Sequence, residues 1–519
     1  MKAVTADQIR ELDQRAIAAG VSGRVLMEAA GLAVHLASYK LDLPRKRWPC
    51  FHCLVLAYKG NNGGDALAAA RQHLENAGVV QTAIFCAARE LKGDTAWHYR
   101  KLKSSIELEV RRHGNGEPPI EIVHIVHESA LEEKAKPQDA GIIIDGLFGT
   151  GLKRPLSWPF DEVVRRVNAS GARVVAVDIS SGLNANTGEP MGGIAIRADV
   201  TVTMGLPKIG LLKEAAIDYV GKLVVAKLPY PPELIEQIKT DVNMIHEDDV
   251  RLMLPRRKFS SHKGDFGHAL IVAGSQGLTG AANLCATACA RTGAGLTTLC
   301  VPENVYPILA AACPPEVMVQ PISDATIESF ASRYASLGCG CGLGQSPEAK
   351  KLVENLIRRW PSPMVLDADA LNNIAANPKI LLQAKAPVII TPHPSEMARL
   401  TGKTATAVNA DRWNIAKTFA REHKCIVVLK GARTVVTDGN ELWINVTGNP
   451  AMASGGVGDA LTGILTGLLA QGLKPFDAAR AGVYLHGLAG NLAHEKLGGR
   501  AILASDLIEH LNAAFATIA

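Results

Sequence analysis

Short, fully apolar runs, most of them bounded by glycine, most constrain the fold of this 519-residue chain. A strand that is apolar at every position must be buried on both faces, as strands are in a parallel sheet covered by helices. In the first half these runs alternate with segments of helical periodicity, so we predict a three-layer α/β/α domain. The runs are CLVLAY, GVVQTAIFCA, GIIIDGLFG, RVVAVDIS, DVTVTM and KLVVAKL.

The same alternation returns from about residue 241 onward. Its last two apolar runs are separated by DGN, a hairpin signal, so the second sheet should be mostly parallel with a small antiparallel addition. Between the halves, LPYPPELIEQ at 228–237 has three prolines within four residues, which indicates a linker. We therefore predict a domain at 1–228, a linker at 229–240 and a second domain at 241–519, since the chain is too long for one core.

Composition excludes several function classes. Hydrophobic residues make up 47% of the chain and charged residues 20%, and the net charge is only +5. The densest basic run, LPRKRWP at 43–49, is too short for a nucleic-acid footprint and is interpreted as a solvated turn. The N-terminus has no apolar signal core and no apolar stretch reaches membrane-spanning length, so we expect a cytoplasmic protein with neither nucleic-acid nor membrane partners.

The ten cysteines follow no disulfide framework, and we expect buried, reduced thiols. Cys50 and Cys53 form one CxxC pair, but no second pair follows at zinc-finger spacing. The simpler interpretation is a pair of cysteines at the edge of a strand.

Two segments share the letters Gly-Asp-Ala-Leu, GGDAL at 63–67 and GVGDAL at 456–461. In each, glycines precede a helical run, and free amides at a helix N-terminus bind anions. Asp65 stands where a helix N-cap is expected, so a plain capped turn is the alternative for the first segment. Because the surrounding segments differ, we interpret the two as one physical solution reached twice and not as a duplication.

Three predicted strands of the first half end in polar, glycine-rich loops. KGNNGGD follows the first strand, Asp145 ends another before a Gly-Thr-Gly loop, and Asp178 ends a third before Ser-Ser-Gly. Ligands of open parallel sheets bind at the carboxyl ends of the strands. The three loops therefore predict one polar crevice, with amides for phosphate and with neutral oxygens and a carboxylate for a monovalent cation.

Four motifs, KGNNGGD, DGLFGTGLKRP, VDISSGLNANTG and TVTMGLPKIG, together resemble the NAD(P)H-hydrate epimerase family over essentially all of 1–228. The resemblance implies a Rossmann-like fold that binds hydrated NAD(P)H, with a potassium ion held by Asn62, Asp145 and Ser181. It makes Asp178 the acid–base residue and a contact of the hydrated nicotinamide. The implied dinucleotide contacts are Asn61, Asn62, Gly63, Gly64, Asp65, Gly149, Thr150, Gly151, Leu152, Lys153, Arg154 and Pro155. Ala66, Ser180 and Asn186 depart from the family pattern without removing an implied functional group.

In the second half, Gly455, Gly456 and Gly458 precede a stripe of apolar residues at helical spacing: Leu461, Ile464, Leu465, Leu468 and Leu469. A carboxylate beside such an amide nest has the position that the base of a phosphoryl transfer needs. Asp459 is therefore the candidate base. Lys430 follows an apolar strand and could meet nucleotide phosphates. His393 follows another strand, and we interpret it as a substrate contact.

SHKGDFGHALIVAGS, TPHPSEMARLTG, VVLKGARTVV and MASGGVGDALTGI resemble the ADP-dependent NAD(P)H-hydrate dehydratases of the ribokinase-like superfamily, over about 245–519. The resemblance implies that ADP phosphorylates the ring hydroxyl of the S hydrate and that phosphate then leaves. The implied hydrate contacts are Ala281, Gly342, His393 and Asp459, with Asp459 as the base. The implied nucleotide contacts are Lys430, Gly431, Ala432, Arg433, Thr434 and Gly458. Cys341 replaces the proline of the family's Gly-Pro-Gly turn. Magnesium is expected with the nucleotide, but no Asp/Glu pair is assigned to it. Asp367 and Asp369 end a strand, and three roles stay open for them: support from behind the site, a contact with substrate, or a helix cap.

We therefore predict an α/β chain with two three-layer domains, Rossmann-like and then ribokinase-like. Its predicted function is epimerisation of R and S NAD(P)H hydrates and ADP-dependent dehydration of the S form, with release of AMP and phosphate. NADH and NADPH hydrates and ADP are the expected small-molecule substrates, and a homo-oligomer is expected. The alternatives are a ribokinase-like vitamin-precursor kinase and a non-catalytic N-terminal binding module, as in mRNA-decapping scaffold proteins.

Overall fold

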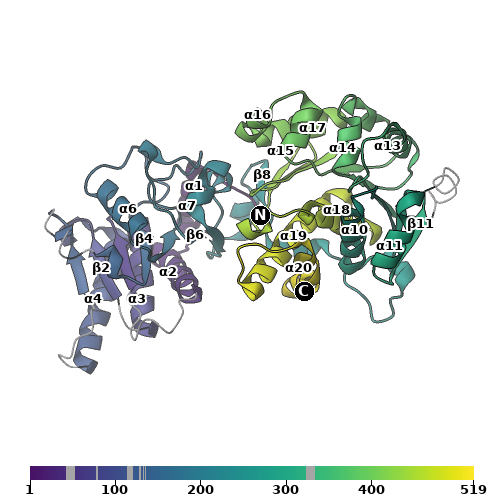
Figure 1. Ribbon diagram of the computed structural model, residues 1–519. Helices are drawn as coiled ribbons and strands as arrows, with labels where there is room; N and C mark the ends of the chain where they lie inside the picture. Colours follow the sequence, from purple (N-terminus) through teal and green to yellow (C-terminus); the bar gives the residue numbers. More distant parts are fainter. Residues whose placement is uncertain are drawn as a thin grey trace. The chain divides into compact units, whose positions relative to one another are not determined.

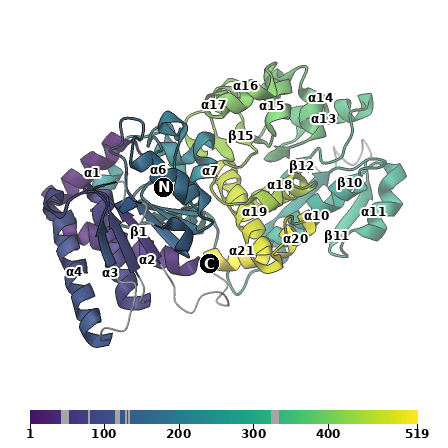
Figure 2. The ribbon, with the colours of Figure 1, turned by 60° about the vertical axis from the view of Figure 1, so that its left-hand side comes forward.

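The computed structural model describes residues 1–41, 53–77, 80–113, 121–127, 130–131, 134, 136–322 and 333–519. The chain forms two compact units, Lys2–Thr240 and Met1 with Asp241–Ala519. Each unit has helices on both faces of its own sheet (Figure 1 and Figure 2), which confirms the predicted fold class. The predicted linker at 229–240 falls within the first unit, where it contains a short helix and the buried Tyr230.

The first unit contains a seven-stranded sheet in the order β3-β2-β1-β4-β5-β6-β7. Every pairing in it is parallel, as the apolar runs predicted. The order reverses between β1 and β4, and this reversal marks the point where open α/β sheets bind ligands. The strands are β1 Cys53–Ala57, β2 Val80–Ile84, β3 Glu121–His124, β4 Ile142–Gly146, β5 Arg173–Val177, β6 Val200–Met204 and β7 Lys222–Ala226.

Alternate residues of the strands enter two separate cores. Val55 of β1 packs with Leu67 in the core that includes α2 and α3, whereas Leu56 packs with Val163 in the core that includes α6. Both faces are therefore apolar, which explains why the runs show no polar alternation. The helices are α1 Ala6–Ala18, α2 Gly23–Lys40, α3 Asn61–Ala77, α4 Gly93–His113, α6 Phe160–Ala169, α7 Ile217–Val220 and α8 Pro232–Glu236.

The second unit contains a ten-stranded sheet in the order β11-β10-β9-β12-β13-β14-β15-β16-β17-β8. Only the β15–β16 and β16–β17 pairings within the described residues are antiparallel, which confirms the predicted hairpin addition. The strands are β8 Val242–Met244, β9 His268–Val272, β10 Leu296–Val301, β11 Val317–Pro321, β12 Ser336–Cys339, β13 Met364–Leu366, β14 Val388–Ile390, β15 Ile426–Leu429, β16 Val435–Thr437 and β17 Leu442–Ile444.

Helices cover both faces of this second sheet. They are α9 Glu247–Met253, α10 Thr279–Thr292, α11 Tyr306–Ala312, α13 Pro347–Arg359, α14 Asp369–Ile374, α15 Pro394–Thr401, α16 Ala405–Ala410, α17 Arg412–His423, α18 Val457–Ala470, α19 Pro475–Leu497, α20 Ala504–Glu509 and α21 Leu511–Ile518.

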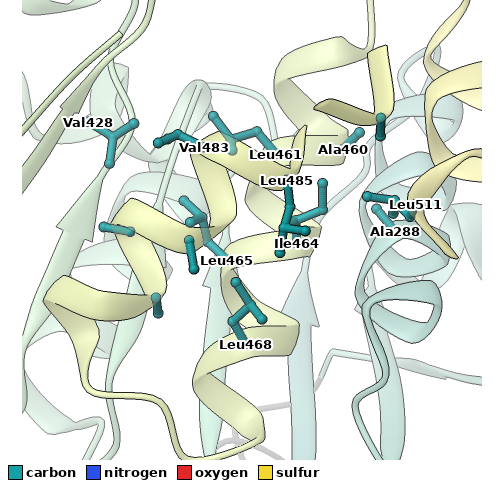
Figure 3. Packing of buried hydrophobic residues seen from close by; sticks show 14 of the residues in the cluster. Ala288, Val428, Ala460, Leu461, Ile464, Leu465, Leu468, Val483, Leu485 and Leu511 are labelled. Atoms are coloured by element: carbon teal, nitrogen blue, oxygen red, sulfur yellow. The ribbon is translucent and has the colours of Figure 1, made fainter. Parts of the chain in front are cut away.

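Helix α18 is buried nearly all round, and not only along the predicted apolar stripe. Figure 3 shows its leucines among Val483 and Leu485 of α19, and the same core includes Ala288 of α10. A Cβ at Gly463 would lie 2.1 Å from the carbonyl oxygen of Cys285, so close packing of α18 on α10 requires glycine there. The helix that carries Asp459 is therefore fixed from several sides.

Two sequence predictions concern residues outside the described part of the chain, the turn at 43–49 and Cys50 of the CxxC pair. The nine described cysteines are free thiols, and all but Cys313 are buried. No described helix combines the length and the apolar character needed to cross a membrane.

Candidate active sites

In the first unit, a cavity of about 490 Å³ lies at the reversal of strand order. The loops after β1, β4 and β5 meet there, as predicted from their carboxyl ends. The predicted contacts that line it are Asn61, Asn62, Asp65, Gly149, Thr150, Gly151, Leu152 and Asp178. Those that do not are the buried Gly63 and Gly64 and the exposed Lys153, Arg154 and Pro155.

The first Gly-Asp-Ala-Leu segment is helical from its start. Helix α3 begins at Asn61, so Asp65 lies a turn inside the helix, and the predicted N-cap position was wrong. A Cβ at Gly63 would lie 1.7 Å from the carbonyl oxygen of Tyr58, so only glycine lets the helix begin this close to β1. Ala66, a departure from the family pattern, is accommodated because its neighbour Gly146 has no side chain.

Asp178 is held on one side by a buried lysine. Lys208 forms an ion pair with Oδ1 of Asp178, and the Met204 amide donates to the same oxygen at 2.9 Å. The Thr203 hydroxyl approaches Oδ1 at 3.4 Å. Asp178 has a φ of 65°, which is uncommon outside glycine, and backbone strain of this kind is concentrated at functional sites.

Three further carboxyl groups line the same cavity, those of Asp13, Asp65 and Asp94. Tyr230 donates a hydrogen bond to Asp13, and burial, the largest cause, raises the pKa of Asp13. Burial raises the pKa of Asp65 well above its usual value; the charges of Asp178 and Asp13 add to this effect, and Lys208 opposes it. The cavity therefore favours the protonated forms of Asp13 and Asp65 more than water does.

The three predicted potassium ligands lie together. Ser181 donates from its hydroxyl to Oδ1 of Asp145 at 2.6 Å and from its amide to Oδ2 at 2.8 Å. Asn62 donates to the carbonyl oxygen of Phe148 at 3.0 Å, and its own Oδ1 is buried without a hydrogen-bond partner among the described residues. Burial raises the pKa of Asp145 to about 6, against the hydrogen bonds from Ser181, which lower it. A buried orphan oxygen beside a buried carboxyl fits a cation.

In the second unit, the glycines at 455–458 lead into α18, with Gly456 as N-cap at φ 87° and Asp459 in the first turn. A Cβ at Gly458 would lie 3.4 Å from Nζ of Lys430. Lys430 pairs with Oδ1 of Asp367 at 2.6 Å, and Thr462 of α18 donates to Oδ2 at 2.7 Å. An ammonium group and free helix amides therefore face the same space, which suits a phosphate.

Asp459 has the environment of a base that titrates near neutrality. Burial raises its pKa to about 6, and a hydrogen bond from the Cys341 thiol partly counters this effect. Cys341 is itself buried and precedes Gly342, where a Cβ would lie 3.1 Å from that of Ala281. The structure thus brings the predicted hydrate contacts Ala281 and Gly342 close to Asp459 through the thiol of Cys341.

His393 caps helix α15. Its Nδ1 accepts hydrogen bonds from the amides of Ser395 at 3.1 Å and Glu396 at 3.3 Å. Nδ1 is therefore an acceptor, and burial, then the charge of Lys430, lowers the pKa of His393. The residue predicted to contact substrate therefore also caps a helix, and its Nε2 lies 3.3 Å from Oε1 of Glu396.

The predicted nucleotide loop, 430–434, is shaped by Arg412 of α17. The guanidinium of Arg412 donates to the carbonyl oxygens of Leu429 at 3.0 Å and Lys430 at 3.2 Å. A Cβ at Gly431 would lie 2.6 Å from this guanidinium, so a side chain at this position would displace it. Gly431 and Ala432 are exposed, whereas Arg433 is buried.

A larger cavity of about 1140 Å³ lies beside this second site, along α13 and the loops after β9, β10 and β12. None of the predicted dehydratase residues lines it, although Leu343 and Gly344 continue directly from Gly342. Its size alone does not assign chemistry, because the charged cluster of Lys430, Asp367 and Asp459 lies outside it. The carboxylate of Asp369 accepts a hydrogen bond from the Gly344 amide at 2.9 Å, and its charge adds to the rise in the pKa of Asp459.

Comparison with known proteins matches both units. A family model described as YjeF-related protein N-terminus matches residues 23–210, and one described as NAD(P)H-hydrate dehydratase matches 269–513. A bifunctional NAD(P)H-hydrate repair enzyme of Moorella thermoacetica is 38% identical over 98% of this chain and 96% of its own. The enzyme of the same name from Escherichia coli is 35% identical over 98% of this chain and 92% of its own. The chain belongs to the bifunctional NAD(P)H-hydrate repair enzymes. This membership confirms the resemblance seen in the motifs of both halves.

One solved structure in the comparison is an ADP/ATP-dependent NAD(P)H-hydrate dehydratase of Bacillus subtilis, co-crystallised with ATP and Mg²⁺. It is 32% identical, with a TM-score of 0.48, and the match covers 54% of this chain and all of that one.

In this NAD(P)H-hydrate repair enzyme, sequence reasoning missed five residues of the two sites. Lys208 lies within a motif that was recognised, TVTMGLPKIG, and its position at a strand end could have indicated it. Asp13 and Tyr230 had no such signal, because one lies in an ordinary helix and the other in the segment taken for a linker. Arg412 and the thiol role of Cys341 depend on tertiary contacts.

Proposed function

We propose that this chain repairs hydrated NADH and NADPH in two steps. The unit Lys2–Thr240 epimerises the R and S hydrates, and the unit that contains Asp241–Ala519 removes water from the S form at the expense of ADP. The near full-length similarity to bifunctional repair enzymes carries the proposal. The positions of Asp178 and Asp459, each beside a loop that suits phosphate, support it.

In the epimerase step, Asp178 exchanges a proton with the hydroxyl on carbon 6 of the ring. The hydroxyl leaves as water with a proton from solvent, the ring nitrogen stabilises the resulting cation, and the Asp178 carboxylate takes the proton of the water that returns on either face. A carboxylate next to the ring stabilises that cation electrostatically. General acid–base help of this kind is worth about 10²–10⁴-fold in rate.

A potassium ion in this unit would be held by Asn62, Asp145 and Ser181. The orphan oxygen of Asn62 and the buried carboxyl of Asp145 support this assignment. The ion would supply a fixed positive charge near the dinucleotide. The chain's own amides at Gly149 and Thr150 would position the phosphates.

In the dehydratase step, Asp459 takes the proton of the ring hydroxyl. A bond forms between that oxygen and the β-phosphorus of ADP, while the bond from this phosphorus to the bridging oxygen breaks and AMP leaves. The carbon–oxygen bond then breaks, phosphate departs, and loss of a proton from carbon 5 restores the double bond. Lys430 and the amides before α18 would hold the phosphates through this transfer.

Magnesium would enter with the nucleotide. No group of three or more His, Cys, Asp or Glu side chains gathers as a metal site within the described ranges. Mg²⁺ commonly binds through substrate phosphates with few protein ligands, and its charge would neutralise the transferred phosphoryl group. The homo-oligomeric state and the cytoplasmic location expected from the sequence stay predictions.

The test uses the full chain with a mixture of R and S NADH hydrates, ADP and Mg²⁺, and follows recovery of the reduced-nicotinamide absorbance. The wild type should convert both epimers. Asp178→Asn should convert only the S fraction to NADH. Asp459→Asn should convert neither epimer to NADH, while chromatography should show that it still interconverts R and S. Recovery limited to the S fraction in the wild type would reduce the first unit to a binding module. Activity only on a vitamin alcohol would favour a kinase.

A further inference from the structure

We propose that Lys208 is the positioning residue of the epimerase site: it anchors one carboxylate oxygen of Asp178 through the buried ion pair and directs the other oxygen toward the bound ring. This proposal rests on the epimerase function proposed above. Five observations carry it: the burial of the lysine, the use of its three protons, the fixed backbone on both sides, the free oxygen of Asp178 and the acidity of the surroundings.

Lys208 is fully buried, with 0% of its surface exposed. Burying an ammonium group costs several kcal/mol unless it is paired, so the site must compensate it. Its Nζ donates to Asp178, to the Thr203 hydroxyl at 3.2 Å and to the Met204 carbonyl oxygen at 3.0 Å. These three acceptors use all three protons of the ammonium group, so Lys208 acts on Asp178 and has no proton left for substrate.

The backbone around both residues is fixed. Val4 pairs with the chain on each side of Lys208: its amide donates to the Pro207 carbonyl oxygen at 2.9 Å, and its carbonyl oxygen accepts from the Ile209 amide at 2.9 Å. The Asp178 amide donates to the Val202 carbonyl oxygen at 2.8 Å. The left-handed conformation of Asp178 is thus maintained by contacts that also set its distance from Lys208.

The ion pair gives the two carboxylate oxygens of Asp178 different environments. All the hydrogen bonds that the Asp178 side chain accepts from the described residues end on Oδ1. Oδ2 accepts none of them, and Asp178 lines the cavity. A carboxylate anchored through one oxygen presents the other in a fixed direction. Such preorganisation is the way a charged group stabilises a developing cation without first reorienting.

The surroundings of the pair are acidic. Asp13 from α1, Asp65 from α3 and Tyr230 after β7 are electrostatically coupled to the pair. Arg10 and Lys59 also line the cavity, but both are exposed. Asp94 of α4 lines the cavity as well. Without Lys208, Asp178 would share this space with three other carboxyls and no buried cation. A carboxylate among like charges, without an opposite charge beside it, is disfavoured in its ionised form, so removing the lysine should weaken the base.

Lys208→Met keeps the apolar stem and removes the charge. We expect the epimerase kcat at pH 7 to fall about 100-fold or more, while KM for the R hydrate changes little, because the lysine does not reach substrate. The acid limb of the kcat profile should also move to higher pH. Lys208→Arg restores the charge and should return the acid limb to its wild-type position even if the larger group lowers the plateau.

The assay uses the full chain and purified R hydrate of NADH without ADP, so that the dehydratase is silent, and chromatography follows formation of the S epimer above the spontaneous rate. Lys222→Met, an exposed lysine on β7, is the matched control and should behave as wild type. Dehydratase activity on the S hydrate, measured with ADP, should be unchanged in every variant.

Several outcomes would overturn the proposal. One is a Lys208→Met enzyme with wild-type kcat and an unmoved acid limb. Another is an equal loss of kcat in Lys208→Met and Lys208→Arg together with a raised KM in both. A lysine with a merely structural role would give this result. If Lys208→Met does not fold, the acid limb of Lys208→Arg decides: it must coincide with that of the wild type. A wild type that does not epimerise would instead refute the proposed function.

Discussion

The ammonium group of Lys430 lies 2.6 Å from Oδ1 of Asp367, although the residues are 63 positions apart. They meet because β15 and β13 end at the same edge of the sheet, next to the first turn of α18. Oε2 of Glu396 lies 3.8 Å from the same ammonium group. Burial lowers the pKa of Lys430, but the two carboxylates outweigh it, so the net direction is upward. The proposed phosphate site therefore already holds an ammonium group in place through these carboxylates.

Replacing Lys430 by methionine should affect stability and activity together. It removes the cation for the phosphates and leaves Asp367, which is 1% exposed, as an uncompensated buried charge. Breaking a buried pair in this way costs about 3–5 kcal/mol. In the wild type, the unfolding transition whose temperature rises with ADP identifies the second unit. Calorimetry of the full-length variant should show a lower temperature for this transition, and the dehydratase rate should fall strongly.

The double variant Lys430→Met with Asp367→Asn separates the two effects. It removes both charges and should recover part of the stability, because the orphan carboxylate is gone. The dehydratase rate should stay low, since no cation meets the phosphates. Lys403→Met, on an exposed residue of the same unit, is the control. Wild-type stability in Lys430→Met would contradict the importance of the pair.

The fold was predictable because burial on both faces leaves a direct trace in the sequence. Runs such as IIID at the start of β4 have no polar alternation, and only a covered parallel sheet accepts them. The hairpin before β17 was predictable from three turn residues. The extent of burial of α18 was not, because it depends on how closely α10 approaches Gly463.

The sites were predictable where backbone loops form them and less so where side chains meet across the fold. Asn62, Asp145 and Ser181 lie close together, since they follow neighbouring strands, and their role as potassium ligands stays a prediction. Tyr230 reaches the cavity from the segment taken for a linker, and Asp13 from the first helix. Periodicity cannot reveal such contacts, because they arise only when distant elements pack together.

The pH dependence of the dehydratase should follow Asp459. Its pKa is about 6, and the base must be ionised, so kcat/KM should fall as the pH falls through about 6. The thiol of Cys341 stabilises the ionised form; Cys341→Ala removes that hydrogen bond and should move the acid limb to higher pH. Cys425→Ala, another buried thiol of this unit, should not move it. If the acid limb of Cys341→Ala coincides with that of the wild type, the thiol does not stabilise ionised Asp459.

Potassium should stabilise the first unit at constant ionic strength. A ligand at ten times its dissociation constant adds about 1.4 kcal/mol. KCl should therefore raise the unfolding temperature relative to tetramethylammonium chloride. Asn62→Ala removes the orphan oxygen and should abolish this difference, whereas Asn76→Ala, an exposed position on the same helix, should retain it. Because burial raises the pKa of Asp145 to about 6, the potassium effect should weaken below that pH. Equal stabilisation by both salts would refute the cation site.

Acid should lower the stability of the first unit through the buried His73. His73 of α3 is fully buried, and its ring centroid lies 5.5 Å from that of His35 of α2. Burial, then the neighbouring His35, lowers the pKa of His73 from 6.5 to about 4. The unfolded chain therefore binds this proton more readily, and the stability contributed by neutral His73 is lost as the pH falls from about 6.5 toward about 4.

The raised pKa values of Asp65 and Asp145 act in the opposite direction in the same unit, so a difference between variants is the clean measurement. Hydrogen exchange of α3 amides in the full chain should show that the advantage of wild type over His73→Gln shrinks by about 2 kcal/mol between pH 8 and pH 5. His127→Gln, at an exposed position of the unit, should differ from the wild type by the same amount at every pH. A constant difference for His73→Gln would mean that this histidine is not held neutral by burial.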